Sequence, residues 1–365
     1  MIAPYVPPPP ADRAAGAARR RGPAPAPAGS RTSRRPHAAP PSPAPTKHHL
    51  LDTPAGRTHA VEQGSGPLVL LLHGFPETWH SWRHQLPALA AAGYRAVAID
   101  VRGYGRSSRP AGSDHYRMTE LVADAVAVVR ALGESEAVVV GHDWGATIAA
   151  HCALLRPDVF RAVGMLGVPY APPGGPRPSE VFAGMGGEEE FYVSYFQEPG
   201  RAEREIEPDV RGWLTGFYAA LSADTMPGPD APDPHFVTRA GGTLRERFPA
   251  GRRPAWLDDA QLDAYAQEFE RTGLEGALNR YRAMDRDWED LAGHAGEPIR
   301  RPALFVAGAE DASVGWLKDA IDAFPTTLPE LRGNHLLDDC GHWVQQERPE
   351  ETNEILTEWL AGLSG

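Results

Sequence analysis

The chain has 365 residues, of which 42% are hydrophobic and 23% charged, and its formal net charge at pH 7 is -12. Proteins that bind nucleic acids neutralise phosphates with lysine and arginine, so we expect no nucleic-acid partner for this acidic chain. It contains no run of 18 apolar residues, which argues against a membrane span. The length suits one large α/β core with an inserted subdomain, or two domains.

The first 47 residues are rich in proline, alanine and arginine and contain few large apolar side chains. Such a composition buries too little surface to offset the entropy lost on ordering, so we predict a disordered tail over residues 1–47. The triplet Arg19–Arg21 suggests a targeting signal, but no apolar segment follows it. A solvated tail is therefore the favoured interpretation.

Between residues 58 and 167, apolar runs alternate with helical patterns. In chain order the predicted elements are strands over Thr58–Glu62, Pro67–Leu72, Tyr94–Ile99 and Arg161–Gly167, with helices over Ser81–Ala92 and Thr119–Gly133 between them. Alternating strands and helices predict a parallel sheet, whose functional loops lie at the carboxyl ends of the strands. We predict a core formed by residues 48–169 and 298–365.

The stretch from Ala137 to Thr147 reads AVVVGHDWGAT and predicts a strand, a sharp turn and a helix. In a nucleophile elbow, the glycines of a G-x-S-x-G pentapeptide let strand and helix approach closely, so the central side chain projects from the turn. Here the central residue is Asp143. A carboxylate is a poor acyl-transfer catalyst but a serviceable nucleophile toward an electrophilic carbon, where it forms an ester. The alternative is a chance turn, since glycine and aspartate are common turn residues.

From residue 170 to residue 297 the alternation stops, and we predict a helical cap domain inserted into the core. Its helical patterns cover Glu188–Phe196, Glu203–Ser222, Asp258–Arg271 and Gly276–Met284. A proline- and glycine-rich loop over residues 226–256 separates them. The α/β pattern then resumes with a strand over Pro302–Ala307, a last strand within Leu328–Leu337 and a closing helix over Glu350–Leu363.

His342 follows the last predicted strand, where a loop can return its imidazole to the elbow as a general base. Such a base needs an acid that orients it, and Asp311 follows the strand over Pro302–Ala307. The order Asp143, Asp311, His342 matches the nucleophile, acid, base order of the α/β-hydrolase fold. A helix N-cap is the alternative role for Asp311. The weaker candidates for the acid are Glu310, Asp338 and Asp339.

Hydrolysis of an ester on Asp143 also needs two backbone N–H donors for the oxyanion. In this fold they come from the residue after the nucleophile, Trp144, and from the loop after an earlier strand, here Phe75 in His-Gly-Phe-Pro. Removal of one such donor typically costs about 2.7 to 4 kcal/mol of transition-state stabilisation.

Three motifs, HGFPE, GHDWGA and GHWVQQERPEE, resemble the soluble epoxide hydrolases of the α/β-hydrolase fold, and the likeness runs from about residue 50 to the end. The resemblance implies conversion of an epoxide and water to a vicinal diol, without a metal or organic cofactor. It also assigns Tyr195 in YFQEPG and Tyr281 in LNRYRAMDRDW to the pair that hydrogen-bonds the epoxide oxygen. A phenol, with a pKa of about 10, can protonate the alkoxide that ring opening generates. Without the resemblance both tyrosines would be packing residues.

The resemblance thus places Phe75, Trp144, Tyr195 and Tyr281 around the substrate. One departure is Arg280, where the family more often has tryptophan, and we expect it to make one pocket wall more polar. The closest rival is a dehalogenase on the same fold, but the halide-binding asparagine and arginine of such enzymes are replaced by Phe75 and Trp144. A silent receptor that keeps the pocket only for binding is disfavoured by the intact triad.

Cys152 and Cys340 are the only cysteines and lie far apart in the chain. They form neither a disulfide framework nor a metal cluster, so we interpret both as free thiols in a reducing interior and expect a cytoplasmic protein. The expected partners are a small epoxide and water, and a homodimer is left open.

Overall fold

The structure is a computed structural model that describes residues 45–54, 56–228, 230–249 and 251–363. These residues fall within one compact unit, residues 43–365. Most of the predicted disordered tail, residues 1–44, lies outside the described residues.

An eight-stranded sheet forms the centre of this unit, with the strand order β1-β2-β4-β3-β5-β6-β9-β10. The strands are β1 (Lys47–Thr53), β2 (Gly56–Gly64), β3 (Leu68–Leu72), β4 (Arg95–Ile99), β5 (Ala137–His142), β6 (Phe160–Leu166), β9 (Ala303–Gly308) and β10 (Leu331–Leu337). β2 is antiparallel to β1 and β4, whereas the other neighbouring strands are parallel. The mostly parallel sheet predicted from the sequence is confirmed.

β1 is a strand that the sequence pattern did not predict. Its residues, KHHLLDT, are exposed or partly exposed along its whole length, because it pairs only with β2 at the edge of the sheet. An edge strand with little buried surface lacks the apolar alternation by which strands are recognised. This stretch therefore resembled the polar tail that precedes it.

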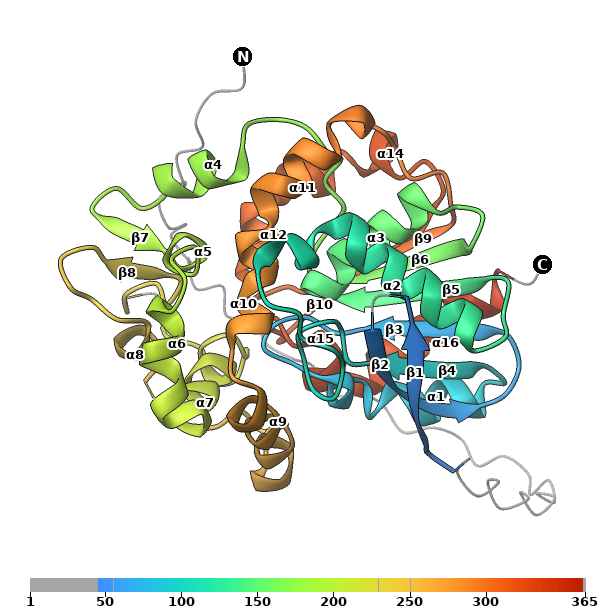
Figure 1. Cartoon of the computed structure of the whole chain (residues 1–365), viewed down its shortest axis with the longest axis horizontal. Coiled ribbons are helices and arrows are strands. Elements are labelled where there is room, and N and C mark those ends of the chain that lie inside the picture. Colours follow the sequence, from blue (N-terminus) through green and yellow to red (C-terminus); the bar gives the residue numbers. More distant parts are fainter. Residues whose placement is uncertain (1–44, 55, 229, 250, 364–365) are drawn as a thin grey trace, which may run out of the picture. The chain divides into compact units, whose positions relative to one another are not determined.

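Helices cover both faces of the sheet (Figure 1). Leu70 and Leu72 of β3 belong to an apolar cluster with α2 (Met118–Ala131) and α3 (Trp144–Leu155). Val69 and Leu71 belong to a second cluster with α1 (Gln85–Ala91) and α16 (Pro349–Ala361). Burial on both faces explains why β3 and β5 read as continuous apolar runs.

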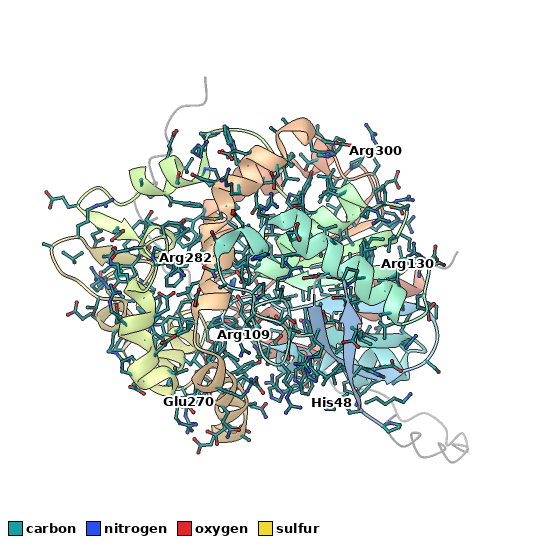
Figure 2. All side chains as sticks on the ribbon, in the orientation of Figure 1. His48, Arg109, Arg130, Glu270, Arg282 and Arg300 are labelled. Carbon is teal, nitrogen blue, oxygen red and sulfur yellow. The ribbon has the colours of Figure 1, made fainter. Side chains whose placement is uncertain are left out.

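The segment between β6 and β9 is mostly helical and lies beside the sheet (Figure 1). It contains α4 (Pro178–Gly184), β7 (Glu189–Phe191), α5 (Tyr192–Tyr195), α6 (Arg201–Ile206), α7 (Val210–Ala220), β8 (Phe236–Thr238), α8 (Leu244–Arg247), α9 (Asp259–Thr272), α10 (Glu275–Arg282) and α11 (Met284–Asp290). In Figure 2, Arg282 and Glu270 lie on this insertion, whereas His48 lies at β1. One apolar cluster joins the insertion to the sheet, since it contains Phe75 together with Trp213 and Tyr281.

Two expectations for the insertion were wrong in detail. The helix predicted over Glu203–Ser222 is split into α6, a 3₁₀ turn and α7, because Pro208 cannot continue the α-helical hydrogen bonds. Asp209 then caps α7 by accepting a hydrogen bond from the backbone of Gly212. The helix predicted over Glu188–Phe196 is a short strand, β7, followed by the single turn of α5, because β7 pairs with β8.

The last part of the chain follows the predicted α/β pattern. After β9 come the short helices α12 (Ala312–Trp316), α13 (Lys318–Asp322) and α14 (Phe324–Thr327), and after β10 come α15 (Val344–Glu347) and α16. Among the described residues, no helix combines the length and the apolar character that a membrane crossing requires.

Candidate active site

Asp143 stands at the turn between β5 and α3, with the backbone angles φ 53° and ψ -121°. A positive φ is uncommon for a residue with a side chain, so the surrounding structure must hold this conformation. The two flanking glycines allow it: a Cβ on Gly141 would overlap the carbonyl oxygen of Gly145, and a Cβ on Gly145 would overlap that of Leu72. A Cβ on Gly74 would collide with the Asp143 carboxylate itself. The turn is therefore tight, and the Asp143 carboxylate projects from it as the central side chain of a nucleophile elbow does.

The imidazole of His342 lies between two carboxylates. Its Nδ1 is 2.9 Å from Asp311 Oδ2, and its Nε2 is 3.6 Å from Asp143 Oδ2. Asp311 also caps α12, since its Oδ1 accepts a hydrogen bond from Ser313 N at 2.9 Å. The two roles considered for Asp311 are therefore compatible, because each uses a different oxygen. The structure brings Asp311, rather than Glu310, Asp338 or Asp339, onto the imidazole.

One of the two expected oxyanion donors contacts the carboxylate, and the other belongs to the next residue in the chain. The N–H of Phe75 donates to Asp143 Oδ1 at 2.7 Å. Trp144 is the first residue of α3, so its N–H is among the first-turn donors that have no acceptor within the helix. Both residues line the same cavity as Asp143.

The charges of the three groups support one another. Burial alone would raise the pKa of Asp143, but hydrogen bonding and attraction from His342 and the N–H of Phe75 hold that pKa below its ordinary value. Burial alone would lower the pKa of His342, but the carboxylates of Asp311 and Asp143 hold it well above its ordinary value. The pKa of Asp311 is also lowered, since the charge of His342 outweighs burial. The resting site therefore favours two carboxylates around one imidazolium.

The cavity next to Asp143 has a volume of about 310 Å³ and is lined mainly by aromatic and aliphatic side chains. Asp143, Asp311 and His342 lie in its wall, together with Phe75 and Trp144. Tyr281 on α10 also lines it, with its ring centre 5.3 Å from that of Phe75 and 5.2 Å from that of Trp144. A small organic molecule in this cavity would contact the carboxylate and a phenol together.

The prediction for Tyr195 is wrong, and Tyr192 lies at the cavity in its place. The hydroxyl of Tyr195 donates to Glu205 at 2.6 Å, and the guanidinium of Arg201 lies 3.6 Å from its ring centre. Tyr192 lines the cavity, and its ring centre is 6.2 Å from that of Tyr281. The sequence FYVSYF offers two tyrosines, and only the turn from β7 into α5 decides which one faces the cavity.

The two phenols that line the cavity remain protonated. Burial raises the pKa of Tyr192, and the nearby charge of Asp143 raises it further. Burial also raises the pKa of Tyr281, with Tyr192 and Asp143 adding to the effect. The cavity that contains the Asp143 carboxylate is therefore also lined by two neutral phenols.

The expectation for Arg280 was also wrong, since this residue does not line the cavity. It is only 3% exposed, and its guanidinium pairs with Asp287 and the carbonyl of Tyr116. The guanidinium lies 4.7 Å from the ring centre of Trp144. Arg280 thus supports Trp144 from outside the cavity instead of making a wall more polar.

The sequence analysis missed a buried pair behind the nucleophile. Glu77, in HGFPE, lies with its Oε2 2.8 Å from His142 Nδ1. The other ring nitrogen, His142 Nε2, is 2.8 Å from the carbonyl oxygen of His342. Gln346 donates to the other oxygen of Glu77 at 2.8 Å. Glu77 stands in the motif HGFPE and His142 in GHDWGA. The sequence around His142 does not indicate that its side chain contacts the loop of His342. This pair fixes the loop that carries His342.

A family model described as the alpha/beta hydrolase fold matches residues 67–349, so the fold and the site define an α/β hydrolase. Epoxide hydrolase B of Mycobacterium tuberculosis is 43% identical over 350 residues, which cover 87% of this chain and 98% of that protein. An epoxide hydrolase from an endophytic Streptomyces is 64% identical in its solved structure, with a TM-score of 0.86 and coverage of 87% of this chain and 96% of that one. Epoxide hydrolase A from Mycobacterium thermoresistibile is 42% identical, with a TM-score of 0.81 and coverage of 87% and 99%. This chain belongs to the epoxide hydrolases of the α/β-hydrolase fold.

Proposed function

We propose that this epoxide hydrolase opens its substrate through a covalent ester on Asp143, and that residues 170–297 act as a cap domain that supplies the two phenols. One observation carries the proposal. The carboxylate of Asp143 and the phenols of Tyr192 and Tyr281 line one cavity, in which His342 Nε2 is 3.6 Å from the nucleophile.

In the first half of the reaction, the epoxide oxygen accepts hydrogen bonds from Tyr192 and Tyr281. A carboxylate oxygen of Asp143 attacks one ring carbon, and the bond between that carbon and the epoxide oxygen breaks. A phenol gives its proton to the departing oxygen, which becomes a hydroxyl group instead of closing the ring again. The product is a hydroxyalkyl ester of Asp143 and a transient phenolate.

Ester formation changes the state of His342. Two carboxylates raise the pKa of the imidazole in the resting site, and the ester removes the charge of one of them. The pKa of His342 therefore falls, and the imidazolium can release a proton, which restores the phenolate to a phenol. The now neutral imidazole remains oriented by Asp311 and is ready to act as a general base.

In the second half, His342 takes a proton from water while the water oxygen attacks the carboxyl carbon of Asp143. The negative charge that forms on the carboxyl oxygen is stabilised by the N–H groups of Phe75 and Trp144. The tetrahedral intermediate then collapses, the alkyl oxygen takes the proton from His342, and the vicinal diol leaves. The carboxylic acid that remains on Asp143 returns its proton to His342, which restores the carboxylate and the imidazolium.

The alternative function is that of a dehalogenase with the same nucleophile. A halide leaves as a stable anion and needs no proton, whereas the alkoxide from an epoxide does. The paired phenols of Tyr192 and Tyr281 can donate that proton, and they favour the epoxide.

A single turnover in ¹⁸O-labelled water tests the ester. The attacking water puts its oxygen into the carboxyl group of Asp143, while the diol receives an oxygen that Asp143 held before. We expect the label in the peptide that contains Asp143 after one turnover and in the diol only after further turnovers. Label found directly in the diol after the first turnover would contradict the covalent intermediate.

A further inference from the structure

His235 lies in the wall of the substrate cavity but takes no part in the reaction proposed above. It stands directly before β8, within residues 226–256, for which the sequence predicted a proline- and glycine-rich loop. Its ring centre is 5.9 Å from that of Tyr192, so it lies beside one of the two phenols. This position places a second imidazole close to the bound substrate.

The ring of His235 is held in one orientation. Its Nδ1 is 2.7 Å from Asp233 Oδ1, and the same oxygen accepts its backbone N–H at 2.9 Å. The ring of Trp316 meets it edge to face, with 4.5 Å between the ring centres. Burial alone would raise the pKa of Asp233. The hydrogen bond and the charge of His235 have the larger effect and lower that pKa, so the carboxylate stays charged beside the imidazole. A buried imidazole with a fixed orientation is preorganised to hydrogen-bond a ligand.

The second ring nitrogen of His235 is left for another partner. Asp233 occupies Nδ1, and no residue in the described part of the chain makes a hydrogen bond to Nε2. The substrate cavity is also lined by the apolar side chains of Phe182, Met185 and Phe191. A smaller cavity of about 150 Å³ shares His235 with the substrate cavity and also contains Asp233. The imidazole is thus a polar group in the wall of a cavity that is lined mainly by apolar side chains.

We propose that His235 Nε2 binds an alcohol group of the substrate, so that the enzyme prefers hydroxylated epoxides over plain hydrocarbon epoxides; this rests on the function proposed above. The choice of an alcohol follows from the chemistry of the ring. A neutral imidazole whose Nδ1–H faces Asp233 offers Nε2 as an acceptor, and a protonated one offers Nε2–H as a donor. A hydroxyl group can both donate and accept, so it pairs with either form.

The backbone contact between His235 and Tyr192 does not need the imidazole. The backbone N–H of Tyr192 donates to the carbonyl oxygen of His235 at 2.8 Å, and this bond does not depend on the side chain. The side chain of Asp233 is 49% exposed, so water can solvate its carboxylate when the imidazole is gone. His235→Leu therefore removes the hydrogen-bonding nitrogen and keeps a side chain of apolar bulk.

The experiment compares two terminal epoxides of equal chain length, one ending in a methyl group and one in a hydroxyl group. Diol formation gives kcat/KM for each, and the ratio of the two values is the readout. We expect His235→Leu to lower the ratio of hydroxyl to methyl substrate about tenfold, which is the usual size for one lost hydrogen bond. The value for the methyl substrate should fall less than the value for the hydroxyl substrate, and His235→Gln should restore part of the ratio, since an amide also donates and accepts.

A matched control is His294→Leu. His294 also pairs through Nδ1 with a carboxylate, Glu297 Oε2, at 2.7 Å, but it is exposed and lines neither cavity. We expect no change in the ratio for this variant. An unchanged ratio in His235→Leu, or an equal fall for both substrates, would overturn the proposal while leaving the epoxide hydrolase mechanism intact. If wild-type enzyme forms no diol from any epoxide, the proposed function itself has failed.

Discussion

The sheet and the insertion supply different halves of the site and fix them by different means. Asp143, Asp311 and His342 follow β5, β9 and β10, so the sheet sets where each side chain begins. Tyr192 and Tyr281 come from a single helical turn, α5, and from an eight-residue helix, α10. Asp143 is held by steric constraints that only glycine satisfies at the neighbouring positions, whereas the positions of the phenols depend on the register of short elements.

Substitutions in the two halves should therefore have different effects. A change at the nucleophile removes the chemistry and leaves the fold, since the turn is determined by its glycines. A change at the phenols slows the same chemistry, because one of two donors remains.

Asp143→Asn should give the largest loss. It removes the nucleophile, and substitutions of this kind typically lower kcat by about 10⁴-fold or more. Asparagine tolerates positive φ well, so we expect the melting temperature to stay close to that of the wild type. The measurement is kcat for diol formation together with thermal unfolding.

Asp339→Asn is the control for that variant. Asp339 is the other non-glycine residue with a positive φ in the described part of the chain, and its side chain is 91% exposed. We expect full activity from it. Equal losses in both variants would mean that backbone strain, and not the nucleophile, had been disturbed.

Tyr192→Phe should reduce activity, whereas Tyr195→Phe should reduce stability. Tyr192→Phe removes a proton donor and should slow ester formation about 100-fold, as loss of a general acid does. Tyr195→Phe leaves the cavity unchanged and should keep activity within about twofold. It removes the hydrogen bond to Glu205, which should lower the free energy of unfolding by about 1.5 to 3 kcal/mol. Stopped-flow fluorescence and chemical denaturation measure the two effects, and the reverse pattern would restore Tyr195 as the phenol of the pair.

The pKa of His342 should differ between the free enzyme and the ester. In the free enzyme two carboxylates raise it, so the imidazolium persists above its usual pH range. In the ester only Asp311 remains charged, so the proton leaves at a lower pH. We expect the rate of ester hydrolysis to rise with pH and to level off below the pH at which NMR shows His342 losing its proton in the free enzyme. Identical titrations in the two states would refute the coupling to Asp143.

Arg280→Met should affect stability more than catalysis. It leaves Asp287 buried without its partner, which typically costs about 3 to 5 kcal/mol of the free energy of unfolding. Because Arg280 lies outside the cavity, we expect kcat/KM to change less than about tenfold. Adding Asp287→Leu should recover part of the stability. A large shift in substrate preference with normal stability would place Arg280 in the cavity wall after all.

Sequence reasoning succeeded where sterics and burial leave a local signal. The apolar run of β5 and the glycines around Asp143 predicted the turn, and the position of His342 after the last strand predicted its contact with Asp143. It failed where a contact depends on tertiary packing. The sequence does not show whether Tyr192 or Tyr195 lines the cavity. The pairing of β7 with β8 and the ion pairs around Arg201 decide it.

The same reasoning explains the other misses. β1 gave no strand signal because an edge strand buries little, and Pro208 was overlooked as the end of a helix. His235 gave no signal either, because its carboxylate partner and the cavity wall come together only in the folded chain.

In the proposed mechanism, Asp143 carries the substrate as an ester that His342 helps to hydrolyse. His342→Gln should stop the second half of the reaction and leave the first intact. After mixing with an epoxide, its intact mass should increase by one substrate molecule, and peptide mapping should place the added mass on Asp143. No adduct in this variant, under conditions where the wild type forms diol, would contradict the account.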